Sequence, residues 1–301
     1  MLPPIIPPGS ALYGTLHQAA RDRRCVFFAG LPGVGKSLLL QQLSLIAGEA
    51  GRRVHLLQWD VARGPFETPE ILARYPERDG VTHAVIRKAA GLWAREAVGA
   101  WDREHADPRD LLIGEVPLIG NRLVELVQRR DDGVEGLLAG AGTVFLIPVP
   151  SREVRRVIEA ARVHEMASPT HERERANAVP SLVQALWEEV AAVARELGVR
   201  GGPTPQPPPH CDGEGGQARQ ERGGEFDPEV YAGVYGRLLR HRRAARLDVT
   251  EALPVQASVY EADTVDGELL PTSEEVARVM AAVEARPEAE VERAVAGWFR
   301  V

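Results

Sequence analysis

A glycine-rich segment at residues 30–37 constrains this chain more than any other feature. It reads Gly-Leu-Pro-Gly-Val-Gly-Lys-Ser and fits the pattern G-x-x-x-x-G-K-[ST]. The apolar run at residues 25–29 predicts a strand before it, and residues 38–47 predict a buried helix after it. In such an arrangement backbone N–H groups curl around phosphate oxygens, and the positive N-terminal end of the helix faces them. The segment therefore predicts a binding site for a nucleoside triphosphate.

The pattern assigns a role to each position of this loop. We expect Lys36 to reach the β- and γ-phosphates and the Ser37 hydroxyl to hold Mg²⁺. Only two of the 36 lysine and arginine residues are lysines, Lys36 and Lys88. The loop therefore carries a compact ammonium group in a chain whose other cationic side chains are almost all arginines. Neither lysine lies in an N/T-K-x-D motif that reads guanine, so we expect ATP. The other expected nucleotide contacts are Gly30, Leu31, Pro32, Gly33, Val34, Gly35 and Leu38.

Length, charge and composition limit the number of domains, the classes of binding partner and the cellular compartment that we expect. A length of 301 residues can hold one large α/β domain or two small ones. The net charge of −7 argues against general nucleic-acid binding and against binding to anionic membranes, because both need an extended basic surface. No run approaches the roughly 18 apolar residues that span a bilayer, and the start lacks the basic and apolar regions of a signal peptide. We therefore expect a cytoplasmic protein.

Two carboxylates follow predicted strands and are candidates for the chemistry. Residues 54–59 predict a second strand followed by Asp60, and residues 111–115 predict a third that ends at Glu115. Ligands of α/β sheets bind at the carboxyl ends of the strands. Glu115 could bind Mg²⁺ directly or through water, or polarise a water as in a hydrolase. The alternatives are that Asp60 caps a turn and that Glu115 is an ordinary acid at a helix N-terminus.

The strand, the GLPGVGKS loop, the helix, a G-R-R-V turn and a strand followed by D-x-x-R together resemble the small-molecule P-loop kinases. The similarity is greatest to the adenylylsulfate kinase, seryl-tRNA kinase and zeta-toxin-like groups, and it covers residues 25–165. It implies an α/β fold of the P-loop NTPase type, with three α/β/α layers and a five-stranded, mostly parallel sheet of order 2-3-1-4-5. It also implies that Asp60 orients or deprotonates the acceptor hydroxyl and that Arg63 binds the acceptor.

A helix with spaced arginines follows the fourth predicted strand at residues 143–150. In the kinases that the chain resembles, such arginines swing onto the transferring phosphate and stabilise its charge. We expect this role for Arg152 and Arg155, with Arg156 and Arg162 as further candidates. Arg152, Arg155 and Arg156 lie within about one turn, so at most two of them can face the site. The alternative is a solvated arginine face.

The chain divides at a tract rich in glycine and proline. We expect a nucleotide-binding core over residues 1–200, a flexible insertion over 201–225, and a segment 226–301 that returns to the same domain. A fifth strand is expected at 246–250 or 255–261. The alternative is a separate winged or hairpin module after the insertion.

Two functions are compatible with these features. The first is a kinase that transfers the γ-phosphate of ATP to an unknown small molecule bearing a hydroxyl group. The second is a nucleotide-dependent regulatory ATPase or switch, in which Glu115 activates water and the C-terminal part engages a protein partner.

Overall fold

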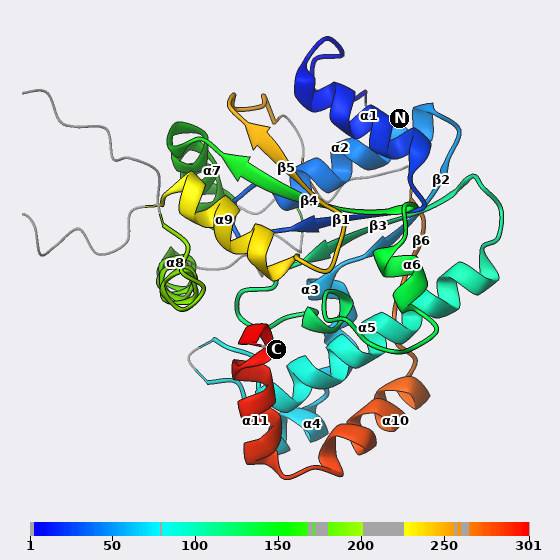
Figure 1. Ribbon diagram of the computed structural model, residues 1–301, viewed down its shortest axis with the longest axis vertical. Helices are drawn as coiled ribbons and strands as arrows, with labels where there is room; N and C mark the ends of the chain where they lie inside the picture. Colours follow the sequence, from blue (N-terminus) through cyan, green and yellow to red (C-terminus); the bar gives the residue numbers. More distant parts are fainter. Residues whose placement is uncertain are drawn as a thin grey trace, which may run out of the picture.

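The computed structural model describes residues 3–78, 80–167, 171, 180–200, 226–255, 258–259 and 265–300. The predicted insertion at 201–225 lies outside these residues. A six-stranded sheet, parallel at every pairing, forms the centre of the molecule, with helices on both faces (Figure 1). Its strands are β1 (Cys25–Ala29), β2 (Arg53–Leu57), β3 (Asp110–Val116), β4 (Thr143–Pro150), β5 (Ala244–Val249) and β6 (Val265–Glu268).

The strand order is β5-β4-β1-β3-β2-β6. It contains the predicted order 2-3-1-4-5, but the prediction of five strands was wrong, because β6 pairs in parallel with β2 and extends that edge. The strand expected at 246–250 is β5, which pairs with β4 over its whole length. The alternative strand at 255–261 is not formed at Val255, and much of that stretch lies outside the described residues. Residues after the insertion thus supply both edge strands.

The central strand β1 is buried on both faces because all five of its residues are apolar. Val26 and Phe28 belong to the cluster that packs under α1 and α2. Cys25, Phe27 and Ala29 belong to the larger cluster that packs against α5, α8 and α9. This alternation follows from the two-residue period of a strand. Because β1 lies between β4 and β3, the loop that follows it lies at the middle of the sheet.

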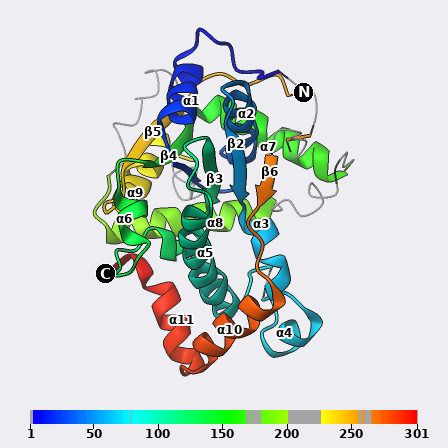
Figure 2. The same ribbon diagram turned by 90° about the vertical axis from the view of Figure 1, so that its right-hand side faces the viewer.

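The helices form layers on the two faces of the sheet. α1 packs on α2 on one face, whereas α5 lies on the other face and carries α10 and α11 on its outer side (Figures 1 and 2). Ser10 caps α1, and Thr272 and Glu275 form a capping box on α10. The helices are α1 (Ala11–Asp22), α2 (Lys36–Glu49), α3 (Trp59–Ala62), α4 (Pro69–Arg74), α5 (Ala84–Glu104), α6 (Glu135–Ala139), α7 (Arg152–Ala167), α8 (Pro180–Glu196), α9 (Pro228–Leu238), α10 (Ser273–Glu284) and α11 (Glu288–Ala296).

None of the helices in the described part of the chain combines the length and the apolar composition that crossing a bilayer requires.

Candidate functional site

The glycine-rich loop joins β1 to α2 at the carboxyl edge of the sheet, as its sequence predicts. Gly33 and Gly35 have φ angles of 80° and 86°, in the left-handed region that favours glycine. The helix α2 begins at Lys36, whose Nζ donates a hydrogen bond of 3.0 Å to the Leu31 carbonyl across the loop. The loop is therefore curled, with the N-terminal end of a 14-residue helix behind it.

Gly30 is required by the close approach of two side chains. A Cβ at this position would lie 2.5 Å from the Tyr231 hydroxyl oxygen and 2.9 Å from Cγ2 of Val34. Because real Cβ atoms do not approach so closely, any larger residue would push α9 away from the loop. Glycine at this position thus allows α9 to pack closely against the start of the loop.

Glu115 lies on β3, next to β1, and faces the same region as Lys36. Its Oε1 accepts a hydrogen bond of 3.1 Å from the Trp59 N–H, and the residue is 7% exposed. Burial raises the pKa of Glu115, and the nearby Lys36 ammonium opposes that rise. Burial likewise lowers the pKa of Lys36, and Glu115 opposes the fall. The loop cation and the acid at the end of β3 therefore form one buried electrostatic unit.

The predicted acceptor pair, Asp60 and Arg63, is in contact. Asp60 lies in the first turn of α3, just beyond β2, and its side chain is 56% exposed. Arg63 Nε lies 3.5 Å from Asp60 Oδ1. Arg63 Nη1 also donates to Glu67 Oε1 at 3.0 Å and to Thr82 Oγ1 at 3.3 Å. Asp60 is thus an accessible carboxylate held beside a partly buried guanidinium group.

The arginines of α7 occupy different places. Arg152 Nε donates to the Phe226 carbonyl at 3.2 Å. Arg155 Nε donates to Glu159 Oε1 at 2.7 Å, and its guanidinium carbon lies 4.3 Å from the centre of the Phe226 ring. Arg162 Nη1 lies 3.8 Å from where a Cβ on Gly33 would stand. Arg162 therefore approaches the glycine loop, whereas Arg152 and Arg155 contact Phe226.

Sequence reasoning missed Arg122, in the loop that follows β3. Its guanidinium carbon lies 5.8 Å from the centre of the Trp59 ring. Burial lowers the pKa of Arg122, and the Asp60 and Glu115 carboxylates oppose that effect. The residue thus joins the carboxylates that the sequence did predict. The local sequence before Arg122 is a Gly-Asn dipeptide, which predicts a turn but does not indicate a ligand-binding residue.

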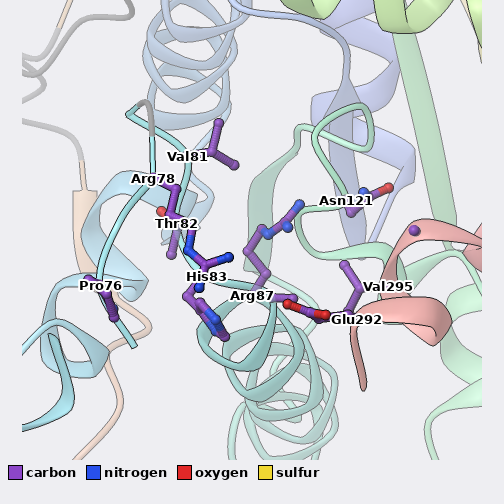
Figure 3. Close-up of a pocket in the computed structure, with 11 residues that line it drawn as sticks. Pro76, Arg78, Val81, Thr82, His83, Arg87, Asn121, Glu292 and Val295 are labelled. Carbon is purple, nitrogen blue, oxygen red and sulfur yellow. The ribbon is translucent and has the colours of Figure 1, made fainter. Parts of the chain in front are cut away.

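A cavity of about 270 Å³ lies beside this group, between the start of α5, the loop after β3 and α11 (Figure 3). Thr82 in its wall accepts the hydrogen bond from Arg63, and so connects the cavity to Asp60. Its lining combines cationic, polar and apolar side chains. The lining residues are Pro76, Arg78, Val81, Thr82, His83, Ala84, Arg87, Asn121, Glu292, Val295 and Ala296.

Three side chains at this cavity have the spacing of metal ligands. Atoms of His83, Glu288 and Glu292 lie within 4.8 Å of one another. His83 Nδ1 accepts the Val85 N–H at 3.3 Å as an N-cap of α5, and its Nε2 lies 3.3 Å from Glu288 Oε1. A neutral ring that carries its proton on Nε2 satisfies both contacts. Because a metal at Nε2 would displace that proton, the capping role and the contact with Glu288 explain this cluster better than a metal does.

The chain matches no protein-family model, no curated protein and no solved structure.

Proposed function

We propose that the chain is a P-loop phosphotransferase that moves the γ-phosphate of ATP to a hydroxyl group of a small acceptor. One observation carries this proposal. A curled glycine loop ends in a buried lysine, and an acid at the carboxyl end of the neighbouring strand shares its electrostatic environment. Phosphoryl transfer depends on positioning and on charge stabilisation, and this unit supplies a cation, backbone N–H groups and a carboxylate within one small region.

The residues at the loop fit a magnesium nucleotide. Gly30 and the left-handed Gly33 and Gly35 leave a backbone cradle that a Cβ would fill or strain. Ser37 and Glu115 offer the hard oxygen donors that Mg²⁺ prefers, and they would hold it there to neutralise phosphate charge. Lys36 would bind the phosphate oxygens, and Arg162 lies where a second cation can reach them.

Asp60 is the group that would orient or deprotonate the acceptor. Its carboxylate is accessible, lies just beyond β2, and is held by Arg63. Arg63 contacts both Asp60 and Thr82, and Thr82 lies in the wall of the 270 Å³ cavity, which has room for a small molecule. We assign this cavity to the acceptor.

A regulatory ATPase is the second candidate, and Glu115 favours it. Burial raises the pKa of Glu115, and a carboxylate with a raised pKa accepts a proton from water more readily. A water activated there would attack the γ-phosphate in place of an acceptor hydroxyl. In that function a protein partner, not a small molecule, would read the nucleotide state.

The nucleotide site is tested by Lys36→Ala. We expect Mg²⁺-dependent binding of a non-hydrolysable ATP analogue to weaken by about 100-fold or more, because a charged hydrogen-bond donor is lost. Calorimetric titration measures this, and circular dichroism verifies the fold. Ser44→Ala is the control, since Ser44 lies on the same helix and donates only to the Leu40 carbonyl. Unchanged affinity in Lys36→Ala would remove the basis of the proposal.

The two acids separate the kinase from the ATPase. If Asp60 serves an acceptor, Asp60→Asn should leave nucleotide affinity nearly unchanged and reduce acceptor phosphorylation by about 100-fold or more. Slow background hydrolysis should survive. Glu115→Gln should weaken Mg²⁺-dependent binding or hydrolysis. The ATPase predicts that Glu115→Gln traps ATP without turnover and that Asp60→Asn has little effect. Phosphate release by both variants distinguishes the two functions before any acceptor is known.

A further inference from the structure

Two guanidinium groups meet at Gly120, in the turn after β3. Arg87, on the first turns of α5, donates from Nη1 to the Gly120 carbonyl at 2.7 Å. Arg122 Nε lies 3.5 Å, and its Cζ 3.7 Å, from where a Cβ on Gly120 would stand. These are ordinary contact distances, so the Arg122 guanidinium lies directly beside the Gly120 backbone. The fold therefore brings two cations from different segments to one backbone position.

These two cations lack part of the compensation that buried charge requires. The Nε atoms of Arg87 and Arg122 are buried and have no hydrogen-bond partner among the described residues. Burial lowers the pKa of Arg87, and the Arg122 charge lowers it further. Glu189 acts on both arginines, but its Oε1 accepts the Gly120 N–H at 3.2 Å, and burial raises the pKa of that carboxyl. A buried N–H donor without a partner is costly, and an anionic ligand would satisfy it.

The turn that holds Arg122 has a strained backbone. Gly120 has a φ of 82°, and the non-glycine residues Asn121 and Leu123 have φ of 59° and 53°. Left-handed backbone at two non-glycine residues within three positions persists only where surrounding contacts impose it, and such residues gather at functional sites. Arg122 lies between these two left-handed residues.

We propose that Arg87 and Arg122 form a second anion-binding subsite, beside the glycine loop, and that the acceptor carries a carboxylate, sulfate or phosphate group bound there. Arg87 lines the cavity, and Arg122 follows Asn121, which also lines it, so the subsite reaches the cavity through Arg87 (Figure 3). Arg122 also shares the electrostatic environment of Asp60, toward which the acceptor hydroxyl would point. The acceptor is then an anionic hydroxyl compound. Its role as acceptor rests on the proposed phosphotransfer, whereas the anion subsite itself does not.

The test uses Lys36→Ala protein, in which the loop cation that could also attract anions is absent. Calorimetric titration with inorganic sulfate should show binding, and adding Arg87→Gln or Arg122→Gln should weaken it by about 10-fold or more. Arg78→Gln is the matched control, since Arg78 lines the same cavity but does not contact Gly120, and it should change affinity less than threefold. Parallel titrations with inorganic phosphate and succinate show whether the subsite prefers a tetrahedral anion or a carboxylate.

Thermal melting verifies that each variant is folded, and Arg122→Lys keeps the charge if Arg122→Gln does not fold. Arg122→Lys should retain part of the affinity, because it keeps the cation and loses the planar fork. Absence of binding of sulfate, phosphate and succinate alike in the Lys36→Ala protein, or equal weakening in all three arginine variants, would overturn the subsite. Failure of the wild-type protein to bind the ATP analogue would instead overturn the proposed function. The anion subsite would then still be judged by the sulfate titrations alone.

Discussion

Two clusters of arginines, one buried and one partly buried, lie on the same face of the sheet and differ in how their charge is compensated. Arg95 and Arg242 are enclosed by Asp132 and Glu135 and by backbone carbonyls. Their side chains are 3% and 0% exposed. Arg87 and Arg122, at the carboxyl edge, each retain a buried Nε with no hydrogen bond to a described residue. Both clusters arise from the same residue type, but only the first is complete without a ligand.

The direction of the pKa shifts records this difference. In the Arg95 and Arg242 cluster, hydrogen bonds from the arginines overcome burial and lower the pKa of Glu135 to about 2. At the carboxyl edge, burial prevails, and it raises the pKa of Glu115 and lowers that of Lys36. A charge that is stabilised where it lies serves the fold. A charge that is held against its desolvation cost is available to a ligand, which is the usual pattern at functional sites.

The largest effect on stability is expected from Arg242→Met. The change removes both contacts from Arg242 to Glu135 and leaves the carbonyls of Leu126 and Gln128 without this donor. We expect the free energy of unfolding to fall by about 3–5 kcal/mol. Urea titration at pH 7 measures it. Its exposed neighbour gives the control, because Arg243→Met should change stability by less than about 0.5 kcal/mol. Similar losses in both variants would show that the saturated cluster contributes nothing special.

A smaller effect is expected from acid. Because the pKa of Glu135 lies at about 2 in the folded protein, below its ordinary value of 4.5, its ionised form stabilises the fold. That contribution is fully present above pH of about 5 and is lost as the pH falls toward about 2. Asp132 follows the same direction, also with a pKa of about 2. Urea titrations across this range should show a decline that becomes shallower in Arg242→Met. Equal slopes in the two proteins would contradict the assignment to this cluster.

The smallest effect on stability is expected from Arg122→Met. This side chain is buried at a desolvation cost and lacks a partner at Nε, so removing its charge should change the free energy of unfolding by less than about 1 kcal/mol. The same urea titration measures it. A loss as large as that of Arg242→Met would mean that Arg122 is a structural ion-pair member, and would erase the contrast between the two clusters.

The centre of the fold could be predicted because its signals are local. The apolar strand, the glycine loop and the buried helix follow one another in sequence, and Asp60 and Arg63 are three residues apart. By contrast, β6 reads Val-Asp-Gly-Glu, with a single apolar residue and no alternation. It becomes a strand through pairing with β2, and Asp266 Oδ2 accepts the Val54 N–H at 2.7 Å. Nothing within those four residues signals a strand.

The candidate site shows the same division. Loop residues are recognisable from a motif, whereas Arg87 and Arg122 are 35 positions apart and meet only because α5 and the turn after β3 pack together. The resemblance to kinases predicts a phosphate-stabilising role for Arg152 and Arg155, with Arg156 and Arg162 as further candidates. The structure brings Arg162, two turns further along α7, nearest to Gly33. Helical periodicity allows Arg155 and Arg162 to share a face, but it does not determine which of the two reaches the loop.

The parallel sheet receives its outermost strands late in the order of synthesis. β4 and β2 remain open edges until residues 244–268 have left the ribosome. Both are largely apolar strands, and an exposed apolar edge is a template for pairing with another chain. If the sheet forms during translation, both of its edge strands stay unpaired until β5 and β6 have been synthesised. Chaperones that bind unpaired edge strands during translation should therefore raise the yield of this folded protein more than that of a protein whose sheet gains strands at one edge only.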